Sequence, residues 1–310
     1  MKSYLVLFFC ILLLSVSIIS CDYVDNPYPQ TVGGDTTGFT AFTFTANPSP
    51  FKKVLVEDYT GFRCPNCPKA GDELASILAS HPDSVIGMGV HVSVGFAEPA
   101  VVSGAPAGSF QSDFRTPEGD NYDNNIFRLS TGVNGGLPKG MINRKDYINS
   151  SSGTHKKSYI SAPTWETEVN TLLAQPPDID LQIHNEYDTV SKILRTQIYS
   201  RFLNSLSGNY KLAILITEDS IYDWQIDNRL ASPSVTQYWH RHVLRTSINS
   251  NDGMGESIAN GTIAVITKRS YTFTPNIGNI PCNADKCHVV AFIYNAANLE
   301  ILQVEEEKVK

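Results

Sequence analysis

Cys64 and Cys67 stand three positions apart in the run Cys-Pro-Asn-Cys-Pro, a spacing that suits thiol–disulfide exchange. Residues 69–80 follow with a helical pattern of apolar positions, so the motif is expected to open a helix, with Pro65 in its first turn. At a helix N-terminus, backbone N–H groups and the helix dipole stabilise a thiolate, and the adjacent Arg63 would favour it further. The second cysteine, one turn along, can attack a mixed disulfide. The motif therefore predicts Cys64 as the nucleophile and Cys67 as the resolving thiol.

A strand, a helix and a second strand are expected to position this motif. Residues 53–59 form a β-rich run before it, and residues 84–94 form an apolar run after the helix at 69–80. A strand–helix–strand unit makes the two strands parallel. Residues 139–144 are a third candidate strand, and residues 165–174 are a candidate helix. Together these elements predict an α/β domain.

Two other segments of this domain carry weaker signals. Residues 38–46 alternate Phe with Thr, which predicts a strand with Phe42 and Phe44 on one face. Residues 95–120 are rich in Gly, Ala, Pro and Ser and predict a long inserted loop, followed by a weak helix at 121–131.

After Pro177 the pattern changes, because runs of alternating apolar and polar residues follow one another without helices. These runs are 181–187, 192–202, 210–217, 262–273, 288–295 and 299–304. The polar segment 204–209 has the composition of a hairpin connection. We therefore predict a boundary near Pro176, with an α/β domain at 38–176 and an all-β, immunoglobulin-like sandwich at 177–310. The three glutamates at 305–307 are expected to form a solvated end.

The motif and its surroundings resemble those of the thioredoxin superfamily. Asp58 lies six residues before Cys64 on the leading strand, and Leu137-Pro138 precedes the third strand. In thioredoxins an acidic residue at that spacing assists proton transfer from the second cysteine, and a cis-proline before the third core strand faces the cysteine pair. The resemblance implies a thioredoxin-like fold, with Asp58 as the proton acceptor and Pro138 as a cis-proline beside the pair.

Other interpretations of the motif stay open. The motif differs from that of thioredoxins at two places: Pro65-Asn66 lies between the cysteines, and Arg63 stands where thioredoxins carry Trp. These differences leave the redox potential and the partner open. In an oxidising compartment the pair can be a permanent structural disulfide. Together with Cys282 and Cys287 it can bind zinc, although a four-residue spacer is wide for such a site. A thioredoxin-like domain can also serve as a binding scaffold without redox turnover.

Two histidines provide a second candidate constellation. On a strand, His240 and His242 would point to the same face and could begin a metal site. The spacing identifies no third ligand, so a structural role near the domain junction is favoured. We predict no bound metal and no cofactor.

The N-terminal residues indicate export. Residues 1–20 predict a signal peptide, because Lys2 precedes an apolar run that is short for a membrane-spanning helix. Ile18-Ile19-Ser20-Cys21 resembles the bacterial lipobox, in which the cysteine is lipidated and becomes the first residue. Several acyl chains on Cys21 would anchor the protein stably, with residues 21–37 as a tether. We predict a lipid-anchored protein of the cell envelope, at the outer membrane; an ordinary signal peptide with a chance cysteine is the alternative.

The remaining cysteines predict a second disulfide, and the net charge excludes one class of partner. Paired cysteines outside the cytosol usually form disulfides, and proximity favours Cys64 with Cys67 and Cys282 with Cys287. The second pair is predicted as a structural disulfide. The net charge of −7 argues against a nucleic-acid partner, since phosphate binding needs a basic surface. The expected partners are the membrane, through lipid on Cys21, and proteins that carry thiols or disulfides.

Several longer runs point to one family. These runs are Val56–Gly61 with Cys64–Pro68, Gly136–Pro138 with Asn143-Arg144, His240–Arg245, and Gly253–Glu256. On these residues the chain, over roughly positions 38–305, resembles the outer-membrane-protein-28-related lipoproteins of Bacteroidota. The resemblance implies a thioredoxin-like domain joined to a β-sandwich on a surface or periplasmic lipoprotein, and it brings no assigned reaction. Two function classes follow: an envelope thiol–disulfide oxidoreductase, or a surface binding or adhesion lipoprotein that keeps the fold as a scaffold.

Overall fold

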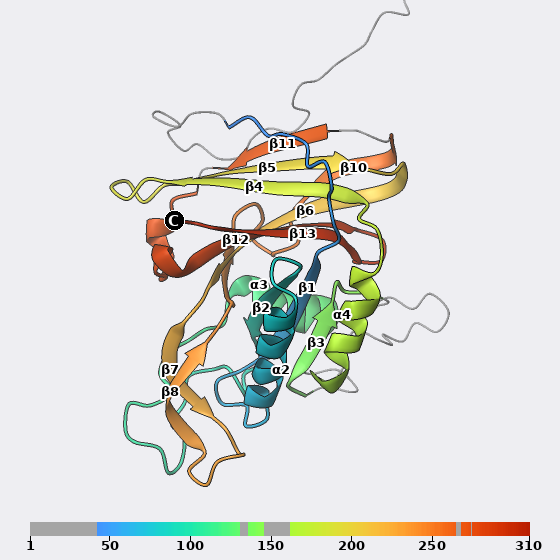
Figure 1. The fold of residues 1–310 in the computed structure, drawn as a ribbon. Coiled ribbons are helices and arrows are strands. Elements are labelled where there is room, and N and C mark those ends of the chain that lie inside the picture. The colour runs from blue at the N-terminus through green and yellow to red at the C-terminus, as the bar shows by residue number, and fades with distance from the viewer. Residues whose placement is uncertain (1–41, 131–135, 146–161, 265–267, 274) are drawn as a thin grey trace, which may run out of the picture. The chain divides into compact units, whose positions relative to one another are not determined.

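The computed structural model describes residues 42–130, 136–145, 162–264, 268–273 and 275–310 (Figure 1). The predicted signal peptide, Cys21 and the tether lie outside the described residues. Within those ranges, no helix combines the length and the apolar character needed to cross a membrane.

The first half of the chain is built on a parallel strand pair joined by a helix. β1 (Val54–Thr60) and β2 (Val85–His91) are parallel and in register from the pair Val54–Val85, with α2 (Cys67–Ser80) between them in sequence. β3 (Lys139–Ile142) pairs antiparallel with the other side of β1. These elements lie where the sequence predicted them.

A shared apolar cluster fixes the two long helices on one face of β1. α4 (Trp165–Leu173), preceded by a 3-10 turn (Ala162–Thr164), lies beside α2 (Figure 1). Val54 and Val56 of β1 meet Leu74 and Ile77 of α2 and the indole of Trp165, all buried. This packing holds the start of α2, and with it the cysteine motif, against the end of β1.

The large sheet does not stop at the predicted domain boundary. Seven of its eight strands follow the order β13-β12-β6-β9-β2-β1-β3. The eighth strand, β10, pairs with β6. The added strands are β6 (Leu206–Glu218), β9 (Val243–Ser247), β10 (Glu256–Ile263), β12 (Cys287–Asn295) and β13 (Ile301–Lys308). β9 joins the halves, because Gly89 of β2 is paired with Val243 and its N–H donates to the carbonyl of His242 at 2.8 Å. Strands from both sides of position 176/177 therefore belong to the same large sheet.

A smaller sheet covers part of the large one. β4 (Ile179–Tyr187), β5 (Leu194–Phe202) and β11 (Lys268–Phe273) form it in the order β11-β5-β4. Its apolar side chains share a buried cluster with β6, β10 and β12. The result is a mixed α/β structure with one large mixed sheet and two small sheets; the immunoglobulin-like form of the sandwich is not confirmed.

Several local predictions in the second half were wrong. Residues 204–209 do not close a hairpin, because β5 and β6 belong to different sheets. The single strand expected at 262–273 is two strands, β10 and β11. The glutamates at 305–307 lie within β13, where Glu305 pairs with Lys53 at 2.5 Å and burial raises the pKa of Glu306 to about 7. Short 3-10 turns at Ile277–Asn279 and Ala284–Lys286 precede β12.

Two segments of the first half also differ from expectation. Residues 42–46 are not a strand, although Phe42 and Phe44 do contact each other and stack on His184 and Tyr199 of the small sheet. The loop after β2 buries Phe110 and Phe114, then leads into α3 (Pro117–Asn121) and a π-helix (Tyr122–Phe127). The π-helix lies where a weak helix was predicted.

Sequence analysis did not identify a two-stranded arm between β6 and β9. β7 (Ile221–Ile226) and β8 (Ser234–His240) pair antiparallel and form a sheet of their own. Figure 1 shows them away from the layered strands, beside the start of α2. We call residues 221–240 the β7–β8 arm. Trp224 and Ile226 of the arm pack against the buried cluster that contains Phe62 and Phe110.

Candidate functional site

Cys64 and Cys67 are joined as a disulfide at the junction of β1 and α2. The helix begins at Cys67. Cys64 lies in the turn before it, and the carbonyl of Cys64 accepts the N–H of Cys67 at 3.3 Å. The proline of the first helical turn is Pro68, not Pro65 as predicted. The Arg63 guanidinium donates to the carbonyl of Val94 at 2.7 Å, which commits it to the loop after β2.

Both sulfur-bearing residues are buried. Cys64 is 1% exposed and Cys67 is 2% exposed. The sequence predicted Cys64 as the more accessible of the two, and the structure shows no such difference. The β7–β8 arm, which the sequence did not predict, binds the backbone of this motif.

The arm binds the motif through its backbone carbonyls. The side-chain amide of Gln225, itself buried, donates to the carbonyl of Cys64 at 3.1 Å and to that of Gly61 at 3.4 Å. The N–H of Ile226 donates to the carbonyl of Phe62 at 2.9 Å. Consecutive residues of β7 therefore hold the turn that carries Cys64.

The tip of the arm reaches α2 through polar groups. The N–H of Asn228 donates to the carbonyl of Pro65 at 3.2 Å, and its side-chain amide donates to the Asn66 side chain at 3.2 Å. Arg229 pairs with Asp72 of α2 at 2.6 Å and with Asp227 at 2.6 Å. These contacts lie at the surface, unlike the bond made by Gln225.

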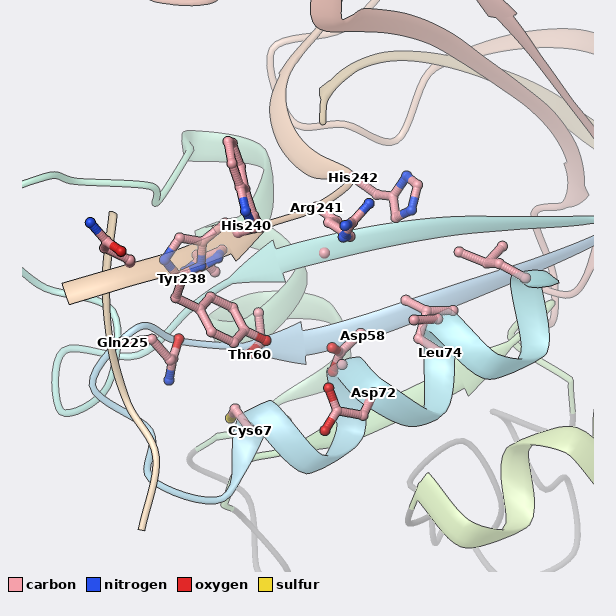
Figure 2. Close-up of a pocket in the computed structure, with 17 residues that line it drawn as sticks. Asp58, Thr60, Cys67, Asp72, Leu74, Gln225, Tyr238, His240, Arg241 and His242 are labelled. Atoms are coloured by element: carbon pink, nitrogen blue, oxygen red, sulfur yellow. The ribbon is translucent and has the colours of Figure 1, made fainter. Parts of the chain in front are cut away.

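A cavity of about 280 Å³ lies between α2, the large sheet and the arm (Figure 2). Its floor includes Asp58 and Cys67, so the structure brings together these two residues that the sequence placed in one site. Tyr238 of β8 reaches into the cavity toward them (Figure 2). Its hydroxyl would lie 3.0 Å from a Cβ at Gly71, so only glycine suits this position of α2 without displacing the tyrosine.

Asp58 is a buried carboxyl group, and burial disfavours its charged form. The residue is 5% exposed, and among the described residues its Oδ1 has no hydrogen-bond partner. Burial raises the pKa of Asp58 to about 7. A carboxyl group with that pKa exchanges a proton readily near neutral pH, which suits a proton acceptor for Cys67.

The histidines of this region are packed and uncharged rather than arranged for a metal. β8 ends at His240, and His242 lies beyond it with a positive φ of 53°, so the two do not share a strand face. The Nε2–H of His240 donates to the carbonyl of Trp224 at 3.0 Å, and the His240 ring packs on His91, at 5.3 Å between ring centroids. Burial lowers the pKa of His240 to about 4 and that of His91 well below its usual range. Across the described ranges, no group of three or more His, Cys, Asp or Glu side chains could hold a metal.

Pro138 lies beside the motif in the cis form. The Leu137–Pro138 peptide bond is cis. A second cavity, of about 340 Å³, is lined by Pro138 together with Pro65, Asn66 and Lys69 of the motif and helix start. Asn228 and Arg229 of the arm complete its wall. The cis form expected for Pro138 is therefore present, and Pro138 lies beside Pro65 and Asn66 of the motif, with an additional wall that the thioredoxin resemblance did not imply.

Cys282 and Cys287 lie far from this site in sequence and are not bonded to each other in the structure. Their thiols are within hydrogen-bond contact, and this contact lowers the pKa of Cys282 and raises that of Cys287. Arg245 lies beside them, in an ion pair with Glu218 at 3.4 Å. Their proximity agrees with the predicted pairing, and the disulfide itself stays a prediction.

The arm residues are the functional candidates that sequence reasoning missed. Gln225, Arg229 and Tyr238 belong to no recognisable motif. One local signal was present: Ile221–Ile226 is rich in aromatic and β-branched residues, which favours a strand. That signal predicts β7 but not where β7 packs.

Several solved structures are similar to this chain at low sequence identity. HBP35 of Porphyromonas gingivalis is 14% identical, with a TM-score of 0.61 over 84% of this chain and 76% of its own. A protein of Agrobacterium tumefaciens is 11% identical, with a TM-score of 0.49 over 84% of this chain and 96% of its own. A domain of the outer membrane lipoprotein Omp28 from Porphyromonas gingivalis is 18% identical, with a TM-score of 0.29 over 43% of this chain and 89% of its own. No curated protein matches the chain.

A family model gives the assignment. The model for outer membrane protein Omp28 matches residues 125–310, which is more than half of the chain. The match confirms the family that the sequence runs suggested, and with it the predicted location in the cell envelope, at the outer membrane. The chain belongs to the Omp28 family.

Proposed function

We propose that this protein is a lipid-anchored thiol–disulfide exchange protein of the cell envelope, with a thioredoxin-like first half. The β1–α2–β2 unit, the antiparallel β3 and the cis-Pro138 beside the motif support a thioredoxin-like interpretation. The lipobox-like run ending at Cys21 supports the anchor. A net negative chain without a basic run supports protein rather than nucleic-acid partners.

The exchange step follows from the positions of three residues. A partner thiolate attacks Cys64 Sγ, a mixed disulfide forms, and the bond to Cys67 breaks. The two electrons of that bond leave with Cys67 as a thiolate, which takes a proton from neutral Asp58. In the reverse direction, ionised Asp58 accepts the proton of Cys67 and the regenerated thiolate attacks the mixed disulfide. The partner supplies or receives the two electrons, so no other cofactor is needed.

One observation carries this proposal: Asp58 and Cys67 line the same cavity, and burial of the Asp58 carboxyl raises its pKa to about 7. A disulfide that only stabilises the fold does not need a carboxyl group beside it. Burying a carboxyl without a compensating partner destabilises the folded state, so its position suggests a chemical role.

Single-cysteine variants test the proposal. We expect Cys67→Ser to leave a Cys64 that traps mixed disulfides with envelope proteins, and Cys64→Ser to trap few. Alkylation rates measured against pH on both variants give the thiol pKa values, and Cys282→Ser serves as a matched control outside the site. A Cys64 that titrates near the unperturbed value of about 8.5 and reacts no faster than Cys67 contradicts the redox proposal.

The second candidate is a binding or adhesion lipoprotein that uses the fold as a scaffold. The burial of both cysteines at 1% and 2% exposure supports it, because a disulfide out of reach cannot exchange. The two candidates differ in one measurement on the purified protein. A pair that equilibrates with a glutathione redox buffer under native conditions supports exchange, and a pair that reacts only in denaturant supports the scaffold.

A further inference from the structure

We propose that the β7–β8 arm is a lid over the Cys64–Cys67 disulfide, and that the pair exchanges only while the tip half of the arm, residues 225–238, is lifted. The inference rests on the proposed exchange function and adds a way in which exchange is regulated. It resolves the conflict between a motif that suits exchange and two sulfurs that solvent barely reaches.

The covering contacts come from one continuous piece of chain. Gln225, Ile226 and Asn228 donate to the carbonyls of Cys64, Phe62 and Pro65, at 3.1, 2.9 and 3.2 Å. These three bonds follow the whole turn that contains the nucleophile. An incoming thiolate must approach Cys64 Sγ along the S–S axis, so it needs this turn uncovered.

The arm is held differently at its two ends. Near its base, Ile221 and Trp224 pack on the buried aromatic cluster with Phe62 and Phe110, which favours a fixed pivot there. At its tip, the ion pair between Arg229 and Asp72 is exposed, with side chains 44% and 65% accessible. An exposed ion pair contributes little to stability, so the tip can be released more easily than the base.

The test measures how fast a small phosphine reduces the disulfide in the native protein. Tris(2-carboxyethyl)phosphine attacks one sulfur, the S–S bond breaks, and water supplies the oxygen of the phosphine oxide and the two thiol protons. Quenched samples are alkylated and digested, and the tryptic peptide 64–69 reports this pair separately from Cys282 and Cys287. No partner protein is needed, so the result is independent of whether the exchange function holds.

Three arm variants and one control complete the design. We expect Arg229→Ala and Asn228→Ala to raise the reduction rate several-fold, and Gln225→Ala to raise it tenfold or more. Lys310→Ala removes a different exposed ion pair, with Asp285 at 2.6 Å, and should leave the rate unchanged. Equal rates, within twofold, for the wild type and the arm variants overturn the lid. If Gln225→Ala fails to fold, the two exposed tip variants decide the question.

Discussion

The carboxylate of Glu57 accepts two hydrogen bonds from the guanidinium of Arg144, at 2.9 Å from Nε and 2.7 Å from Nη2, with both side chains fully buried. The guanidinium also faces the rings of Tyr122 and Phe127 at 4.8 and 4.9 Å, and that of Phe292 at 5.0 Å. Phe292 comes from β12, so this ion pair ties the first half of the chain to the second.

Breaking this pair should destabilise the protein strongly. Arg144→Met leaves the buried Glu57 carboxyl without its ion-pair partner, and such losses cost about 3–5 kcal/mol. The double variant Glu57→Gln with Arg144→Met should recover part of that loss. Urea denaturation measures both, with Lys310→Ala as a surface ion-pair control. A loss below about 1 kcal/mol for Arg144→Met would show that the pair does not join the two halves.

Asp58 should make stability depend on pH. Its pKa is about 7 in the folded protein and about 3.9 in an unfolded chain, so the folded state holds the proton more tightly. Stability should therefore fall as the pH rises from about 4 to about 7, and stay lower above that range. Asp58→Asn removes the ionisation, and its advantage over the wild type should grow through this window to at most about 4 kcal/mol.

Urea denaturation at several pH values measures this effect, and Asp83→Asn, at an exposed turn, is the control. Asp58→Asn should also slow thiol exchange, because Asn cannot accept the proton of Cys67. Higher stability combined with lower exchange distinguishes a chemical role from a structural one. An unchanged stability profile between pH 4 and 8 would show that Asp58 is not held neutral by burial.

Cys282 and Cys287 should form a disulfide in the exported protein. The two thiols are in contact, and this contact lowers the pKa of Cys282. Cys282 is therefore the thiol of the pair that ionises more readily when the two are oxidised. Because the loop they close is short, we expect a contribution of at most about 2–3 kcal/mol. Non-reducing peptide mapping of protein isolated from the envelope checks the bond. Two free thiols in such a sample would contradict it.

Cys21→Ser should release the protein from membranes or block its processing, because a lipid on this cysteine is the proposed anchor. Cys10→Ser, within the predicted signal peptide, is the matched control and should leave membrane association unchanged. Membrane fractionation and intact-mass analysis measure both variants. A mature N-terminus that is unmodified and downstream of Cys21 rules out the anchor.

Local sequence pattern was sufficient for the first half of the fold. α2 and α4 have a helical pattern and β1, β2 and β3 lie within short β-rich or apolar runs, so their type and order could be predicted. The joining of the halves could not, because the pairing of Gly89 with Val243 depends on segments far apart in sequence. A strand pattern shows that a segment pairs, and it does not show with which neighbour.

The candidate site was predictable to the same extent. Asp58, Cys64, Cys67 and Pro138 carry recognisable spacing, and the structure brings them together. The contact of the motif with the arm could not be predicted, because the bond from Gln225 to the Cys64 carbonyl joins residues 161 positions apart. The strands of the arm also leave Tyr222 and Trp239 about half exposed, which weakens the apolar alternation by which strands are recognised.

That separation of 161 residues between Cys64 and Gln225 also sets an order in time. A chain that enters the envelope N-terminus first presents its cysteine pair well before β7 arrives. During this interval the pair is as accessible as in any unfolded chain, and an envelope oxidant can join the two sulfurs without moving an arm. When β7 then docks, it encloses a bond that is already oxidised. The newly made protein would therefore leave its assembly carrying one stored disulfide, which can oxidise one pair of thiols once a partner reaches the turn.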